Sequence, residues 1–212
     1  MVSARPTFDR LLGSVRRSGL AFAAGFSMMT IELMAGRLTA PALGSSLYTW
    51  TATIASVMAG VALGAWAGGT IADKKRNGPL IGPILLVAAV SVLGTLIVAQ
   101  ALGPILSAAN APIQLLTITF ALAVFLPPSV ALGAVTPALL TRRLMSTTQT
   151  GEVYGSLGAW NAAGSILGVY FTGFFLIGYV GTRTAYLATA AILALLGLIT
   201  WIREVRRSTP VV

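Results

Sequence analysis

The chain has 212 residues, of which 56% are hydrophobic and only 9% are charged, and its mean hydropathy is +0.88. A soluble domain carries about 25% charged residues, so this composition excludes an ordinary soluble enzyme, a disordered tail and a nucleic-acid-binding domain. The chain has no cysteine and no histidine, which excludes disulfides, thiolate or imidazole metal sites and Ser-His or Cys-His catalysis. We therefore expect an all-α membrane protein with no metal, no cofactor, no nucleic-acid partner and no enzymatic activity.

Six apolar stretches are long enough to cross a bilayer, which needs about 20 residues per helix. In chain order they are Gly19–Leu38, Leu47–Ala72, Leu80–Leu102, Ile113–Leu140, Tyr154–Ile177 and Ala185–Ile202. They define a transmembrane domain over residues 19–202. A basic arm (residues 1–18) precedes it, as a topogenic flank or lying on the anionic inner leaflet, and a tail (residues 203–212) follows. Alternatively, the first stretch is a cleaved signal peptide, which would leave five spans.

Basic residues fall in alternate gaps between the stretches. The opposite gaps hold only Arg37 and Arg183. By the positive-inside rule, the basic gaps and both termini face the cytoplasm, which predicts a multi-pass protein of the inner (cytoplasmic) membrane. The residues in the basic gaps are Arg5, Arg10, Arg16, Arg17, Lys74, Lys75, Arg76, Arg142, Arg143, Arg203, Arg206 and Arg207.

The first stretch contains Glu32, the only one of the five acids that lies well inside a span. A carboxylate at that depth is costly unless it is protonated, paired or hydrated, so it indicates a functional site by default. Glu32 could bind a cationic substrate or carry a proton. The alternatives are an ion pair with Arg37 and a neutral acid that is hydrogen-bonded to a neighbouring helix.

Small residues recur at every fourth position in the second stretch and at the same spacing in the fifth. Such a stripe allows another helix backbone to approach closely. We interpret the stripes as packing surfaces within one bundle, with a sliding or dimer surface as the alternative. They consist of Ala52, Ser56, Gly60, Gly64, Gly68 and Ala72, and of Gly164, Gly168 and Thr172.

The fourth stretch carries Pro127 and Pro128 near its middle. Neither has an N–H, so the carbonyls of Ala123 and Val124 lose their helical donors. A helix break at the midplane is typical of transporter binding sites, and a simple packing kink is the alternative. Further candidates for a lined cavity are Gln100, Ser129, Trp160 and Asn161, whereas Tyr48, Trp50, Tyr179 and Trp201 are predicted to lie in interfacial aromatic belts.

Two similar motifs suggest an internal repeat. "TAPAL" (Thr39–Leu43) ends the first stretch and "VTPAL" (Val135–Leu139) ends the fourth, and a glycine-striped stretch follows each. Because the first and fourth spans run in opposite directions, the two triplets of spans would form an inverted 3+3 repeat. The match of three letters, Pro-Ala-Leu, could also be a coincidence.

The connection after the second stretch, "GGTIADKKR" (Gly68–Arg76), resembles the cytoplasmic-loop signature of the major facilitator superfamily. Gly69, Asp73 and Lys74 match its core, and the resemblance implies that these residues act in gating. A plain helix C-terminal stop gives a similar pattern.

Three segments together resemble the membrane part of the transmembrane spermidine synthase-like proteins. They are Ile31–Asp73, with Glu32, Arg37 and the turn Gly44, Ser45 and Ser46, then Gly133–Leu144, and Tyr154–Ile177 with Asn161 and Gly164. The resemblance implies a fold similar to half of a major facilitator protein. Members of that family usually carry a cytoplasmic aminopropyltransferase domain, and no such domain follows the spans in this sequence. We therefore do not extend synthase activity to it.

Two functions fit these features. The first is a half-size carrier for a small organic cation such as a polyamine, working as a homodimer by alternating access as one protomer rocks against the other. The alternative is a membrane anchor or regulatory subunit for a separately encoded, soluble aminopropyltransferase-like chain, docked on Asp73–Gly78 and Arg142–Glu152. The expected substrate-binding residues of the carrier are Glu32, Arg37, Pro127, Pro128, Trp160 and Asn161.

Overall fold

The computed structural model describes residues 5–75, 79–144 and 150–208, and these residues form helices and no strand. Six of its helical segments are long and apolar enough to cross a membrane, which confirms the predicted all-α, six-span architecture. In chain order the elements are α1 (Arg5–Leu43), α2 (Leu47–Lys74), α3 (Ile81–Ser107), α4 (Ile113–Gly133), α5 (Val135–Leu144), α6 (Thr150–Phe171), the π-helical η1 (Thr172–Leu176), α7 (Ile177–Tyr179) and α8 (Thr182–Ser208).

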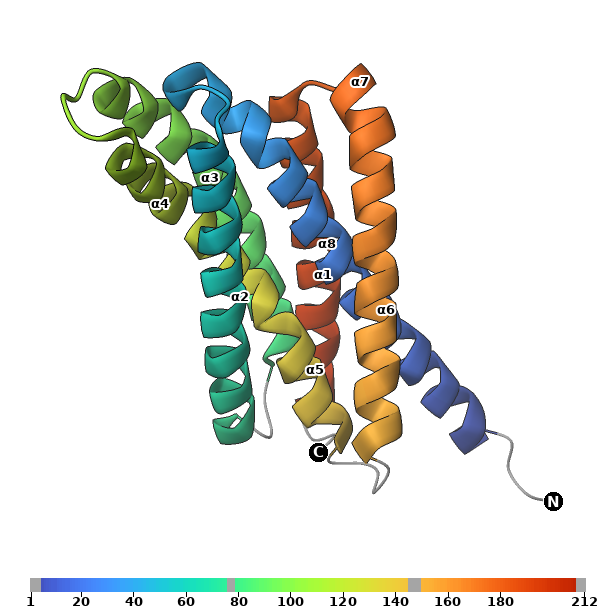
Figure 1. The fold of residues 1–212 in the computed structure, drawn as a ribbon. Helices are drawn as coiled ribbons and strands as arrows, with labels where there is room; N and C mark the ends of the chain where they lie inside the picture. The colour runs from blue at the N-terminus through green and yellow to red at the C-terminus, as the bar shows by residue number, and fades with distance from the viewer. Residues whose placement is uncertain (1–4, 76–78, 145–149, 209–212) are drawn as a thin grey trace.

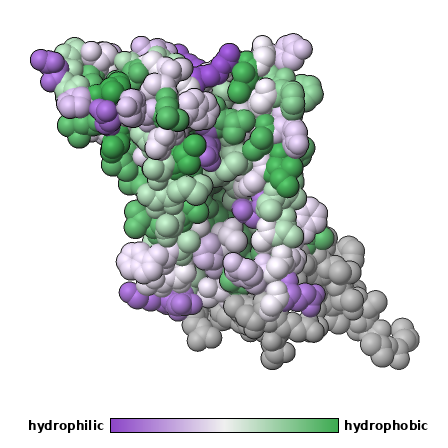
Figure 2. Space-filling view, viewed as in Figure 1, coloured by the Kyte–Doolittle hydropathy of each residue, from purple (hydrophilic) through white to green (hydrophobic). Residues whose placement is uncertain are grey.

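The outer helices extend beyond the predicted membrane domain. α1 runs without interruption from Arg5 to Leu43, and α8 continues to Ser208. The boundaries predicted at residues 18 and 203 therefore do not coincide with helix ends, because arginine-rich flanks are good helix formers and the helical hydrogen bonds do not stop where the apolar run stops. Figure 2 shows an apolar surface with the most hydrophilic residues lying mostly near the two ends of the molecule.

The six spans alternate in direction, so α1 begins and α8 ends at the same end of the bundle (Figure 1). We call this end, where α2 and α5 also finish and α3 and α6 begin, the termini end, and we call the opposite one the far end. Three helix pairs make the most extensive contacts: α1 with α6, α2 with α4, and α3 with α8. Of the predicted docking loops, residues 76–78 and 145–149, including Arg76, lie outside the described residues.

The turn between the first two spans has a clear local cause at the far end. Gly44 adopts a left-handed conformation with a φ of 73°, and its N–H donates to the Ala40 carbonyl at 3.0 Å. A glycine in this conformation commonly ends a helix because it carries no Cβ. Ser46 then caps α2, since its hydroxyl accepts the Thr49 N–H at 3.2 Å.

The fourth span is not interrupted where its paired prolines predict. α4 continues through Pro127 and Pro128, and the Thr95 hydroxyl of α3 donates to the Val124 carbonyl at 3.3 Å, replacing the donor that Pro128 lacks. Only Ala134, between α4 and α5, departs from regular helix, and it keeps helical dihedral angles (φ −73°, ψ −19°), donates to the Val130 carbonyl and accepts the Ala138 N–H. Pro137 has no N–H to offer the Gly133 carbonyl, and α4 ends at Gly133.

Glycines bring α1 and α6 into backbone contact. A Cβ added to Gly164 would overlap the Phe22 carbonyl, and one on Gly168 would lie 2.7 Å from the Phe26 carbonyl oxygen. Both glycines are buried. Any larger side chain at these positions would push the two helices apart, so this glycine stripe packs inside the bundle.

The pair α2 and α4 is built in the same way. A Cβ on Gly64 would overlap the Val130 carbonyl, and one on Gly68 would lie 2.6 Å from the Ala134 carbonyl oxygen. One turn earlier on the same stripe, a Cβ on Gly60 would lie 2.5 Å from the Cβ of Ser129. The stripe on α2 is thus buried within the chain and does not form a free dimer surface.

Each glycine contact between α1 and α6 has an equivalent contact between α4 and α2. Along each helix, the residue numbers of equivalent positions differ by the same amount. The matching contacts are Gly164–Phe22 with Gly64–Val130, Gly168–Phe26 with Gly68–Ala134, and Gly25–Asn161 with Gly133–Val61. The third pair, α3 and α8, matches itself: Gly82 against Trp201 corresponds to Gly197 against Leu86. The first three spans therefore relate to the last three as an inverted repeat.

The register of this repeat differs from the one that the sequence motifs suggest. "TAPAL" and "VTPAL" align Pro41 with Pro137, whereas the helix contacts make Met29 the counterpart of Pro137. The motif-based alignment of the repeat is therefore wrong, although the pairing of spans follows the predicted 3+3 scheme. The two triplets repeat the same backbone contacts, but they do not repeat the same amino-acid sequence.

Candidate functional site

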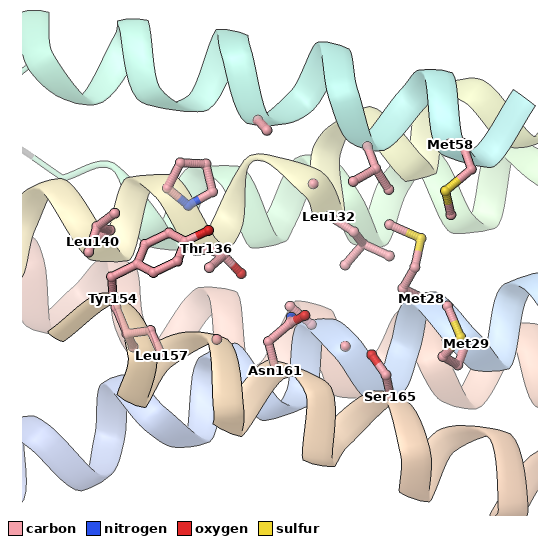
Figure 3. Close-up of a pocket in the computed structure, with 17 residues that line it drawn as sticks. Met28, Met29, Met58, Leu132, Thr136, Leu140, Tyr154, Leu157, Asn161 and Ser165 are labelled. Atoms are coloured by element: carbon pink, nitrogen blue, oxygen red, sulfur yellow. The ribbon is translucent and has the colours of Figure 1, made fainter. Parts of the chain in front are cut away.

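A cavity of about 460 Å³ lies between the α1–α6 pair and the α2–α4 pair, and it continues along α5. Figure 3 shows the side chains of 17 lining residues, which approach the cavity from these helices on opposite sides. Cavities of this size are typical of small-molecule sites between helices of a bundle. The glycine contacts described above bound the cavity, because they fix how closely the helices of each pair approach.

The residues that the first two spans contribute to the lining are apolar. α1 contributes Met28 and Met29, and α2 contributes Met58, Val61 and Ala65. Methionine side chains are flexible and polarizable, so they adapt to ligands of different shape. These residues offer van der Waals contact and no side-chain hydrogen bond.

The fourth and fifth spans contribute the polar groups. α5 contributes Thr136 from the side of α2 and α4, and α6 contributes Tyr154, Asn161 and Ser165 from the side of α1. The Asn161 side chain is held in place, because its amide nitrogen donates to the Ala21 carbonyl of α1 at 3.1 Å. The polar groups therefore lie on both sides of the cavity.

The junction between α4 and α5 is part of the lining. Gly133, Thr136 and Pro137 all line the cavity, and they surround Ala134. Because Pro137 has no N–H, the Gly133 carbonyl lacks its usual helical donor.

No charged side chain is among the described residues that line this cavity. A polyamine bound here would meet no carboxylate, and an unpaired charge in a poorly hydrated site is costly. The lining instead suits a molecule with a large apolar part and one or two hydrogen-bonding groups.

Glu32 does not line the cavity. It lies on α1 toward the far end and is half-buried, and its Oε2 atom is fully buried with no hydrogen-bond partner. The predicted pairing with Arg37 is not formed in the described structure, because Arg37 donates from Nη1 to the Ile177 carbonyl at 2.8 Å. This bond ties α1 to the end of the fifth span.

Three more predicted binding residues lie outside the cavity lining. Trp160 is exposed and meets Phe22 edge-on, with ring centroids 6.5 Å apart. Pro127 is exposed and Pro128 is buried within the bundle. Of the six expected substrate-binding residues, only Asn161 lines the cavity.

The predicted gating residues lie at the termini end of α2. Asp73 and Lys74 are exposed, and no heavy atom lies within 4 Å of a Cβ added to Gly69. Gly69 therefore differs from its buried neighbour Gly68, which packs against Ala134. Nothing in the described packing ties these three residues to the cavity.

Glu204 forms a connection at the termini end that the sequence does not indicate. Its carboxylate accepts the N–H groups of Leu80, Ile81 and Gly82 at 3.0 to 3.2 Å and lies 3.9 Å from Arg142 Nη1. A carboxylate at a helix N-terminus satisfies donors that the helix itself leaves free and interacts favourably with the helix dipole. Glu204 thus links α8, α3 and α5.

The other cavity candidates lie elsewhere. Gln100 lines a second, shallower cavity of about 390 Å³ between the far-end halves of α1 and α3. Ser129 is buried beneath Gly60, and its hydroxyl has no hydrogen-bond partner. Neither residue reaches the cavity between the helix pairs.

Comparisons with known proteins give no further guide to this site. No family, no curated protein and no solved structure matches the chain.

Proposed function

We propose that this protein is a carrier-type membrane protein that binds a small organic solute in the cavity between its two helix pairs. The observation that carries the proposal is the position of the cavity between two helix pairs that the inverted repeat relates to each other. Transporters with inverted repeats bind their substrates at the interface of the repeats. The interior of a purely structural bundle is packed without voids of this size.

The cavity extends toward the termini end, where Leu140 and Tyr154 line it. The charge distribution supports a cytoplasmic location for this end, since Lys75, Arg142 and Arg203 lie there and Arg183 lies at the far end. In this proposal the protein spans the cytoplasmic membrane with both termini inside and with the cavity nearer the cytoplasmic side.

The solute class follows from the lining. Three methionines together with an amide and hydroxyls favour an amphipathic organic molecule. An organic cation such as a polyamine requires a negative group at the site, and Glu32 is the only acid within a span. The cation therefore stays a prediction that depends on Glu32.

A thermal-shift screen of the purified protein tests the proposal. A solute that binds only the folded protein at 100 times its dissociation constant stabilises it by about 2.7 kcal/mol. We expect at least one compound from a panel of amphipathic amines, amino acids and polyamines to raise the midpoint of the wild type. Asn161→Val should lose the shift relative to its own ligand-free midpoint, and Trp160→Leu should keep it, because Trp160 lies outside the cavity.

A panel that leaves the wild-type midpoint unchanged would contradict binding of these classes. A compound that shifts wild type and Asn161→Val equally would place its site elsewhere.

Homodimer formation and docking of a soluble aminopropyltransferase-like chain stay predictions. The cavity lies within one chain, so the proposed binding needs no second copy. Light scattering of the protein in detergent would measure the oligomeric state, and co-purification would test the docking of a partner chain.

A further inference from the structure

The cavity follows the inverted repeat residue by residue. The shifts that relate the helix contacts also relate the two walls, so that Met28 corresponds to Thr136, Met58 to Gly158 and Ala65 to Ser165. All but three of the described lining residues have a lining counterpart on the opposite wall. In the main part of the cavity, the lining residues therefore occupy symmetry-related positions, although their side chains differ in chemistry.

The three exceptions are Leu140, Tyr154 and Leu157. Figure 3 shows them together at one end of the cavity, which is the termini end. Their counterparts in the first two spans are Glu32, Ile54 and Val57. None of these counterparts lines the cavity, so the cavity extends from its symmetric centre in one direction only.

The far end is closed by contacts between α1 and α2. The indole ring of Trp50 packs on Gly36, where an added Cβ would lie 3.1 Å from the ring carbon Cζ2. Glu32 lies one helical turn below this contact, with its Oε2 atom buried and unpartnered. Glu32 also follows Met28 by one helical turn, and Met28 lines the cavity, as does Leu140, the counterpart of Glu32.

We propose that the chain has a second conformation in which the two triplets exchange their conformations. The cavity then extends toward the far end, and Glu32, Ile54 and Val57 replace Leu140, Tyr154 and Leu157 in its lining. The two triplets make equivalent helix contacts, so each can adopt the arrangement that the other now has, and a ligand shifts the balance between the two states. The inference rests on the proposed carrier function.

This exchange gives the site a carboxyl group in one conformation only. A cationic group of the solute is bound through Glu32 when the cavity faces the far end and loses that partner when the cavity faces the termini end. Hydration from the cavity also explains how an acid is tolerated at this depth, where a permanently dry carboxylate would be costly.

The absence of cysteine from the sequence makes the second conformation directly measurable. Single cysteines at Glu32 and Leu140 are treated with a membrane-impermeant methanethiosulfonate, in right-side-out and in inside-out membrane vesicles. We expect Leu140→Cys to react from the side of the termini and Glu32→Cys to react from the opposite side. Ile31→Cys and Leu139→Cys are matched controls, since both residues are buried, neighbour the test positions and line no cavity.

Ile54→Cys provides a second reporter in case Glu32→Cys fails to fold. Ile54 does not line the cavity in the present conformation, whereas its counterpart Tyr154 lines it and is 67% exposed. The proposal is overturned if Leu140→Cys reacts while Glu32→Cys and Ile54→Cys are unreactive from both sides. Reaction of all three from the side of the termini would contradict it as well.

Removing the far-end contact should shift the balance between the conformations. Trp50→Ala is expected to raise the rate of Glu32→Cys modification several-fold and to lower that of Leu140→Cys. Trp66→Ala is the matched control, because Trp66 lies on the same helix but is 73% exposed. It should leave both rates unchanged.

The two proposals fail in different ways. Modification from opposite sides in a protein that no solute stabilises would leave the second conformation standing and remove the carrier. A solute that stabilises the protein while Glu32→Cys and Ile54→Cys never react would retain the binding site and remove the exchange.

Discussion

The two walls of the cavity share a geometry and differ in chemistry. Val61 on α2 and Asn161 on α6 occupy counterpart positions beside counterpart glycines, Gly133 and Gly25. The first two spans contribute thioethers and hydrocarbon to the lining, and the fourth and fifth spans contribute an amide and hydroxyls. The difference indicates that close backbone packing constrains the glycines of both triplets, whereas the lining side chains between them are free to differ.

The two helix pairs also differ in how they are joined. Hydrogen bonds cross between the first and fifth spans, from Asn161 to the Ala21 carbonyl and from the Thr172 hydroxyl to that of Thr30 at 3.0 Å. Within the described residues, no side-chain hydrogen bond joins α2 to α4, where the buried Ser129 hydroxyl is unpartnered. The α2–α4 pair therefore depends on close packing alone, and the predictions below test this difference.

The largest expected effect is overpacking of a glycine stripe. Gly64→Leu places a side chain where the Val130 carbonyl lies, and overpacking costs about 1–3 kcal/mol or more. We expect loss of monodisperse protein on size-exclusion chromatography in detergent. Gly164→Leu, at the counterpart position, should behave similarly, because the Phe22 carbonyl is equally close.

Gly69→Leu is the control for that pair, since no heavy atom lies within 4 Å of its added Cβ. A Gly64→Leu protein that elutes and melts like the Gly69→Leu protein would contradict the packing described for α2 and α4.

The next largest effect is expected at the third helix pair, α3 and α8, which the charged side chain of Glu204 helps to hold together. Glu204→Ala leaves the N–H groups of Leu80, Ile81 and Gly82 without their acceptor. Hydrogen bonds to charged groups contribute about 1.5–3 kcal/mol, so we expect a clear fall in the thermal midpoint. Glu152→Ala, which changes an exposed acid on α6, should leave the midpoint near that of the wild type.

A smaller effect is expected where a polar lining residue is replaced by its apolar counterpart. Ser165→Ala gives α6 the residue that α2 already has at Ala65, and it removes a hydroxyl from the lining. Losing a hydrogen bond of about 0.5–1 kcal/mol weakens solute binding about two- to fivefold. Titration of the solute found by thermal shift measures this change, and unchanged affinity would place the polar part of the solute away from Ser165.

The smallest expected effect is at the paired prolines. Thr95→Val removes the donor to the Val124 carbonyl, and a hydrogen bond between membrane helices contributes about 0.6 kcal/mol on average. We expect a slightly lower thermal midpoint with unchanged solute affinity, since Thr95 does not line the cavity. A loss of affinity would indicate that the proline segment belongs to the site.

Much of the fold could be predicted from the sequence, because span number depends on apolar length and the glycine stripes depend on helical spacing. The register of the repeat could not, since it is set by backbone contacts such as Gly25 with Asn161 rather than by shared letters. The capping role of Glu204 could not be predicted either, because its carboxylate accepts from N–H groups that lie more than a hundred residues away in the chain.

The candidate site was predicted only in part. Asn161 and Trp160 are adjacent in sequence, yet only Asn161 faces the cavity, because successive residues on a helix point in different directions. When a helix is apolar on all sides, its sequence does not indicate which side faces the cavity. A broken helix was expected at Pro127 and Pro128, but a neighbouring hydroxyl satisfies the Val124 carbonyl there, and the only departure from regular helix is at Ala134, before Pro137.

Solute protection of the cavity tests the central claim most directly. Leu140→Cys lines the cavity and Lys75→Cys lies on the exposed end of α2 outside it. The impermeant thiol reagent is applied from the side of the termini, with increasing solute. We predict that a solute which raises the thermal midpoint slows modification of Leu140→Cys in proportion to its occupancy and leaves Lys75→Cys unaffected. A solute that stabilises the protein without protecting Leu140→Cys would contradict binding between the helix pairs.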